Sequence, residues 1–201
     1  PDKRTFFGLK ANAAVFFPSL IIIVSIVAIT LIVGKPIESW FGAAQKLVAN
    51  NSGWLLILII NFLLVFCIYL ATSRFGRIRI GGPDATPDFS NLAWFSMLFS
   101  AGMGIGLLFF SVAEPIYHFN SNPFLTEGGD KVAAAESAMG ITFLHWGLHG
   151  WAVYALVGLA VAFFAYNRGL PLSIRSVFHP ILGDRIYGRW GDIIDIIAVV
   201  A

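Results

Sequence analysis

The chain has 201 residues, a formal net charge of +2 and a mean hydropathy of +0.80. Only 12% of its residues are charged, about half the share usual in soluble domains, whereas 58% are hydrophobic. This composition indicates an integral membrane protein. It also argues against a nucleic-acid partner, because the basic residues are few and dispersed along the chain.

Four apolar stretches are each long enough to cross a bilayer, which takes about 20 helical residues. They are residues 13–33, 53–72, 91–113 and 136–166, and a fifth apolar run begins at Ile193. We therefore predict an all-α integral membrane fold with four complete transmembrane helices and the start of a fifth. Because the fifth run is too short to span and the chain has no initiator Met, we expect the N-terminal piece of a longer, transporter-like protein.

The positive charges predict the orientation in the membrane. Ten of the thirteen Lys and Arg residues lie before the first span, between the second and third spans, or after the fourth. Since Lys and Arg accumulate on the cytoplasmic side, we predict that the N-terminal segment 1–12 and the loops 73–90 and 167–192 are cytoplasmic. The loop 114–135 is then outside.

The third span is interrupted in its middle by Gly102, Gly104 and Gly106. Each glycine disfavours a helix by about 1 kcal/mol relative to Ala, and backbone that leaves a helix inside the membrane needs partners in protein, water or a ligand. Secondary transporters use such segments to offer carbonyls to ions and helix N-termini to anionic groups. Close packing of helices through small residues is the alternative interpretation.

Two further boundaries follow from prolines. Pro115 disfavours a helix at the preceding residue, so we expect the third span to end at Ala113 and residues 116–123 to form turns. After the fourth span, residues 171–182 predict a short amphipathic helix at the cytoplasmic interface, with Arg175 on its polar side.

The fourth span carries a cluster of aromatic side chains. On a continuous helix that turns by about 100° per residue, Trp146, His149 and Tyr154 share one side and Trp151 lies further round. Aromatic ring faces attract cations and form cages for quaternary ammonium groups. Helix packing and an interfacial aromatic belt are the alternatives, although a belt would lie closer to the end of a span.

His145 and His149 lie four residues apart, which is a spacing found in metal sites, and intramembrane histidines also serve in proton relays. No third ligand stands near them in the sequence, so we predict hydrogen bonds to other helices and no metal site. Asn61 and Asp195 are two further polar residues for which we expect a buried, structural role.

Three strings together resemble the betaine/choline/carnitine transporter family: AGMGIG at 101–106, FFSVAEP at 109–115 and HWGLHGWAVY at 145–154. The resemblance implies twelve transmembrane helices, with a LeuT-like core of two inverted five-helix repeats. It makes 13–72 two accessory helices and 91–201 the beginning of the first repeat. That part would comprise a broken helix at 91–113, an aromatic-box helix at 136–166, an interfacial helix at 171–182 and the start of the next helix at 193–201.

The resemblance also implies a set of site residues. Trp146, Trp151 and Tyr154 would belong to an aromatic box around a trimethylammonium group, and the backbone of Ala101, Met103, Gly104 and Gly106 would approach the substrate. The carbonyls of Ser100 and Met103 would help to hold a sodium ion, and Phe109 would lie near the outer gate. No organic cofactor is implied. The expected setting is the bacterial inner membrane, with the lipid bilayer and further copies in a homotrimer as partners.

The substrate signature is mixed. Gly106 stands where choline-importing relatives often carry Asp, which favours a zwitterion such as glycine betaine. Gly150, where many betaine importers have Pro, and the string LPLSIRS at 170–176 are closer to choline importers. We expect secondary active uptake of glycine betaine by sodium symport with alternating access. Uptake of choline, carnitine, ectoine or dimethylsulfoniopropionate by proton symport is the alternative.

Two other classes of protein stay open at this point. An intramembrane enzyme is disfavoured because the chain has no metal-binding triad, nucleophile elbow or paired carboxylates. A purely structural membrane subunit would use the glycines for helix packing alone.

Overall fold

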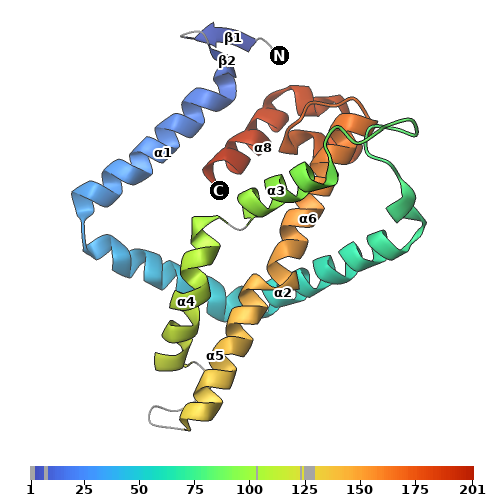
Figure 1. Cartoon of the computed structure of the whole chain (residues 1–201). Helices are drawn as coiled ribbons and strands as arrows, with labels where there is room; N and C mark the ends of the chain where they lie inside the picture. Colours follow the sequence, from blue (N-terminus) through green and yellow to red (C-terminus); the bar gives the residue numbers. More distant parts are fainter. Residues whose placement is uncertain (1–2, 7–8, 103, 123, 125–129) are drawn as a thin grey trace. The chain divides into compact units, whose positions relative to one another are not determined.

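The computed structural model describes residues 3–6, 9–102, 104–122, 124 and 130–201, and these are mainly helical (Figure 1). The helical class predicted from the apolar stretches is therefore confirmed. A short antiparallel hairpin precedes the helices, formed by β1 (Lys3–Phe6) and β2 (Leu9–Asn12). This hairpin was not expected from the sequence.

Three helical stretches in the described part of the chain are long and apolar enough to cross a membrane. They are α1 (Ala13–Val33), α2 (Pro36–Thr72) and the stretch Lys131–Asn167. The bounds of α1 coincide with the first predicted span. In contrast, α2 begins at Pro36, so the predicted loop before Gly53 is largely helical. Pro36 at the first helical position and Glu38 in the first turn are both signals for a helix start.

The third predicted span consists of two helices, α3 (Asn91–Gly102) and α4 (Ile105–Asn120), which Figure 1 draws as separate coils. With 12 and 16 residues, each is short of the length needed to span on its own. The predicted number of four complete transmembrane helices is therefore not confirmed. The interruption itself falls at the glycine cluster.

α4 does not end where the sequence predicted. It continues through Pro115 to Asn120, so the expected end at Ala113 is wrong, and so are the turns expected at 116–120. Pro123, the last residue of those expected turns, lies outside the described residues. Proline removes one backbone hydrogen bond, and membrane helices tolerate this loss because local adjustments and neighbouring helices satisfy the freed carbonyl.

The fourth predicted span is also broken. α5 (Lys131–Trp146) ends at Gly147, which is extended with φ −86° and ψ −153°, and α6 (Leu148–Ala162) follows, continued by the π-helical turn η2 (Phe163–Asn167). A Cβ atom on Gly147 would lie 2.3 Å from the carbonyl oxygen of Phe143. Glycine therefore allows an approach of the backbone that any other residue would prevent.

The chain forms two compact units, one of residues 1–58, 80–82 and 157–201 and the other of residues 59–79 and 83–156. The second unit contains the short 3-10 turn η1 (Arg74–Arg77), which follows α2. Beyond residue 167 the first unit contains short turns rather than one amphipathic helix. They are η3 (Ile174–Phe178), α7 (His179–Leu182) and η4 (Gly183–Tyr187), and they precede α8 (Arg189–Val200). The predicted single helix over 171–182 is absent from this described stretch.

Arg175 explains why this region departs from the prediction. Its side chain is buried rather than on a polar surface, and its guanidinium donates to Asp195 Oδ2 at 2.7 Å and to Asp192 Oδ1 at 2.9 Å. The two carboxylates lie three residues apart and so share one face of α8. Asp195 thus has the structural role predicted for it, and Asn12 donates to Asp192 from the start of α1 at 2.9 Å.

Replacing Arg175 by Met is expected to destabilise this unit strongly, because it leaves two largely buried carboxylates without their cation. Loss of one partner of a buried ion pair costs about 3–5 kcal/mol, and the midpoint of thermal unfolding of the full-length protein should fall accordingly. Arg185→Met is the matched control, since Arg185 is exposed. Equal unfolding midpoints for the two variants would show that the Arg175 ion pairs contribute little.

Candidate functional site

The interruption between α3 and α4 exposes backbone groups of both helices. The last four carbonyls of an α-helix have no partner within that helix, and in α3 these include the carbonyls of Ser100 and Ala101. The C-terminal end of a helix carries partial negative charge, so these oxygens are suited to a cation. Met103, the other carbonyl predicted for an ion, lies outside the described residues.

On the other side of the interruption, α4 begins with the positive end of its helix dipole. A Cβ atom on Gly104 would meet nothing closer than the Ser100 carbonyl oxygen at 3.8 Å, and one on Gly106 would meet nothing within 4 Å. Packing among the described residues therefore does not require either glycine. Their missing side chains leave the backbone accessible to a small molecule.

The structure brings two of the three predicted aromatic-box residues together. The rings of Trp151 and Tyr154 lie 5.8 Å apart with an interplanar angle of 43°, and Tyr154 is 73% exposed. The indole N–H of Trp151 donates to the carbonyl of Trp146 at 2.9 Å. This bond satisfies a carbonyl at the very end of α5, where the helix breaks.

Trp146 does not share a helix face with Tyr154, as a continuous helix would have required, because Gly147 separates the two helices. Instead, the Trp146 ring stacks on Phe110 of α4, with centroids 5.7 Å apart and an interplanar angle of 24°. Phe109, the predicted gate residue, meets Phe110 edge to face at 5.3 Å and is 65% exposed. The aromatic segment thus contacts the broken helix one turn after Gly106.

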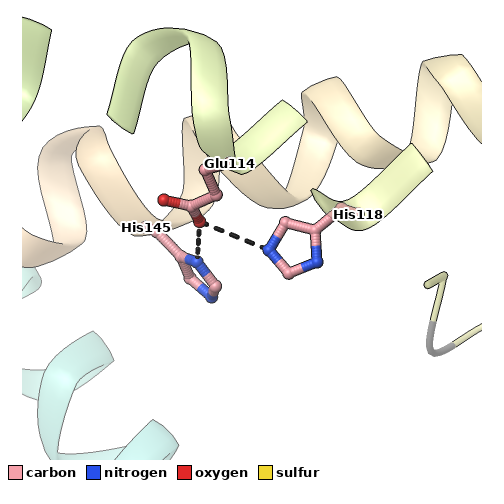
Figure 2. Close-up of side chains that lie close together, drawn as sticks. All are labelled: Glu114, His118 and His145. Carbon is pink, nitrogen blue, oxygen red and sulfur yellow. Dashed lines mark hydrogen bonds and ion pairs between the residues drawn. The ribbon is translucent and has the colours of Figure 1, made fainter. Parts of the chain in front are cut away.

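Glu114 is the residue that sequence reasoning missed. Its carboxylate accepts a hydrogen bond from the indole N–H of Trp146 through Oε2. Its other oxygen, Oε1, contacts His145 Nδ1 and lies 3.4 Å from His118 Nε2 (Figure 2). From the sequence, Glu114 was expected at the start of the outer loop 114–135, directly after a span. The available signal was the spacing of Glu114 and His118, which lie four residues apart in an apolar stretch. Ionisable groups inside a membrane are usually paired and functional, so this spacing could have indicated a site.

The hydrogen bonds predicted for the two histidines of the fourth span are present. His145 on α5 contacts Glu114 on α4, and His149 Nε2 on α6 lies 3.4 Å from Asn61 Oδ1 on α2. Cys67 of α2 adds a weaker contact, with Sγ 3.5 Å from the carbonyl of Ala152. Polar pairs therefore link neighbouring helices within this unit.

The sequence matches the family model of betaine/carnitine/choline transporters over residues 14–201. The chain belongs to this family. Its similarity to curated transporters agrees with that assignment. A glycine betaine transporter of Acinetobacter baylyi is 39% identical over 200 residues, which cover 100% of this chain and 30% of the relative.

Two further relatives come from other bacteria. A probable glycine betaine transporter of Desulfitobacterium hafniense is 50% identical over 155 residues, covering 77% of this chain and 31% of its own length. A glycine betaine/proline/choline transporter of Vibrio parahaemolyticus is 42% identical over 210 residues, covering 97% of this chain and 38% of its own length. This chain of the betaine/carnitine/choline transporter family thus spans about a third of the length of these curated relatives.

Proposed function

We propose that the full-length protein takes up a trimethylammonium compatible solute, with glycine betaine as the first candidate, by sodium symport with alternating access. The observation that carries this proposal is the interruption of the helix between Gly102 and Ile105, next to an aromatic segment that contacts α4. The names of several relatives, which include glycine betaine, support the same substrate.

The two ends of a betaine molecule require different partners. A trimethylammonium group has no N–H to donate, so aromatic faces are its suitable partners, and Trp151 and Tyr154 offer two adjacent rings, with Trp146 as the third proposed member of the box. The carboxylate requires donors and positive potential, which the first turn of α4 after Gly104 supplies. The backbone of Ala101, Met103, Gly104 and Gly106 is the proposed path of approach.

Sodium coupling is proposed from the other end of the interruption. The Ser100 carbonyl belongs to the last turn of α3, and it would act with the carbonyl of Met103 and groups from the rest of the protein. A sodium ion bound to these carbonyls would hold the interrupted segment in the geometry that receives the substrate. Binding of sodium would therefore favour binding of the substrate. Phe109 is the proposed outer gate, and a homotrimer in the bacterial inner membrane with a cytoplasmic N-terminus is the proposed assembly.

Choline uptake by proton symport is the second candidate. The Vibrio parahaemolyticus relative that covers 97% of this chain has choline as well as glycine betaine in its name. The Glu114 carboxylate in contact with His145 also offers an exchangeable proton site between two apolar helices.

The test is uptake by the full-length protein in bacteria that lack their own osmolyte importers. We expect labelled glycine betaine to accumulate with sodium present and to fall to background when potassium replaces sodium, and excess choline should not compete. Choline uptake that is indifferent to sodium and abolished by a protonophore would favour the second candidate and contradict the sodium site.

A further inference from the structure

The cluster of Glu114, His118 and His145 is not part of the proposed substrate or sodium site. Glu114 and His118 lie four residues apart, on one face of α4, and His145 reaches the same carboxylate oxygen from α5. Figure 2 shows the imidazole rings of His118 and His145 both directed at the same oxygen of Glu114. One ligand atom from each of the three residues lies within 4.8 Å of the other two.

We propose that these three side chains form a binding site for a divalent transition-metal ion of the Zn²⁺ type, which joins α4 to α5. Two imidazole nitrogens and one carboxylate oxygen make a His₂Glu ligand set, which binds zinc and leaves a fourth position for water or another ligand. Calcium and magnesium prefer ligand sets made of oxygen atoms alone, so the chemistry of this cluster selects against them.

One distance in the cluster is close to that which such an ion needs, whereas His145 Nδ1 contacts the same Glu114 oxygen directly and would have to move away from it to admit an ion. With metal–ligand bonds of 2.0–2.2 Å, the ligand atoms of a tetrahedral site lie about 3.3 Å apart, and Glu114 Oε1 and His118 Nε2 are separated by 3.4 Å. The His145 side chain is 52% exposed. Its ring can therefore turn to complete the site without moving the core of the helix pair.

The surroundings of the cluster predict a site of moderate affinity. The Glu114 carboxylate is held by the Trp146 indole N–H through its second oxygen, which orients the ligand atom. His118 lacks equivalent support, because its Nδ1 is buried without a hydrogen-bond partner among the described residues. Since such outer partners change metal affinity by about 10- to 100-fold, binding should be weaker than at a fully supported zinc site by a factor of this order.

The test is a titration of the purified full-length protein in detergent with Co²⁺, whose visible absorption reports tetrahedral coordination by nitrogen and oxygen. We expect one Co²⁺ per chain at this site, displaced by Zn²⁺ and not by Ca²⁺ or Mg²⁺. His118→Ala should abolish the absorption band. His179→Ala is the matched control, because His179 lies in α7 and is not one of the three proposed ligands, so this variant should leave the titration unchanged.

A second variant distinguishes loss of a metal ligand from misfolding of the protein. His145→Gln changes an exposed side chain, and we expect it to weaken Co²⁺ binding at least tenfold while Zn²⁺ no longer raises the midpoint of thermal unfolding. A titration of the unchanged protein that matches those of His118→Ala and His145→Gln would overturn the proposal. Because metal binding is measured without transport, this result is independent of the outcome of the uptake experiment.

Discussion

Replacing Gly104 by Ala is expected to reduce uptake of glycine betaine by about 100-fold while the full-length protein still reaches the membrane, since a displacement of about 1 Å at a reacting or binding centre can have an effect of this size. A Cβ atom at this position would be 3.8 Å from the Ser100 carbonyl oxygen, which is an ordinary contact. The backbone, with φ −60° and ψ −174°, is one that Ala also adopts. The fold therefore accepts the methyl group, and only a molecule that approaches the backbone would be displaced by it.

Gly140→Ala is the matched control for this prediction. Gly140 lies within α5, and a Cβ atom there would meet nothing within 4 Å. Ala should favour the helix at that position by about 1 kcal/mol and leave uptake unchanged. Normal uptake by Gly104→Ala would contradict a substrate path along this backbone. A Gly104→Ala protein that fails to accumulate in the membrane would instead indicate the packing role considered for the glycine cluster.

The features that the sequence predicted correctly depend on local physics. The length of the first apolar stretch was enough to locate α1, and three glycines within five residues were enough to locate the interruption before α4. Both signals act over one or two helical turns, so no knowledge of distant residues was needed.

Some of the features that were missed leave only a weak local signal, and others depend on contacts between distant residues. Gly147 ends α5 because its backbone approaches the Phe143 carbonyl, yet a lone glycine in an apolar helix is usually tolerated. Arg175 is buried because Asp192 and Asp195 lie beside it on α8, 17 and 20 residues away. Nothing in the local sequence shows whether an Arg will find such partners.

The same reason applies to the Glu114 cluster. His145 contacts a carboxylate 31 residues earlier in the chain, and this contact exists only because α4 and α5 lie against each other. The assignment of Glu114 to a loop came from Pro115, whose effect on the preceding residue was overridden by the rest of α4. A prediction of which helices pair would have brought these residues together.

Trp151→Leu is expected to raise the half-saturation concentration for betaine uptake by about 30-fold, which corresponds to about 2 kcal/mol for a desolvated cation–π contact. Trp54→Leu is the matched control, because Trp54 lies in α2, is 68% exposed and has no place in the proposed box. Equal half-saturation concentrations in the two variants would exclude Trp151 as a ligand of the ammonium group.

The Leu variant alone does not separate the two roles of Trp151, since its indole N–H also donates to the Trp146 carbonyl. Trp151→Phe retains an aromatic face and removes the donor. If the ring face binds the cation, Phe should keep the half-saturation concentration well below that of Leu, by about fivefold for a contact weaker by about 1 kcal/mol. If the hydrogen bond at the end of α5 is what matters, Phe and Leu should be equally impaired, and the aromatic box would lose its central member.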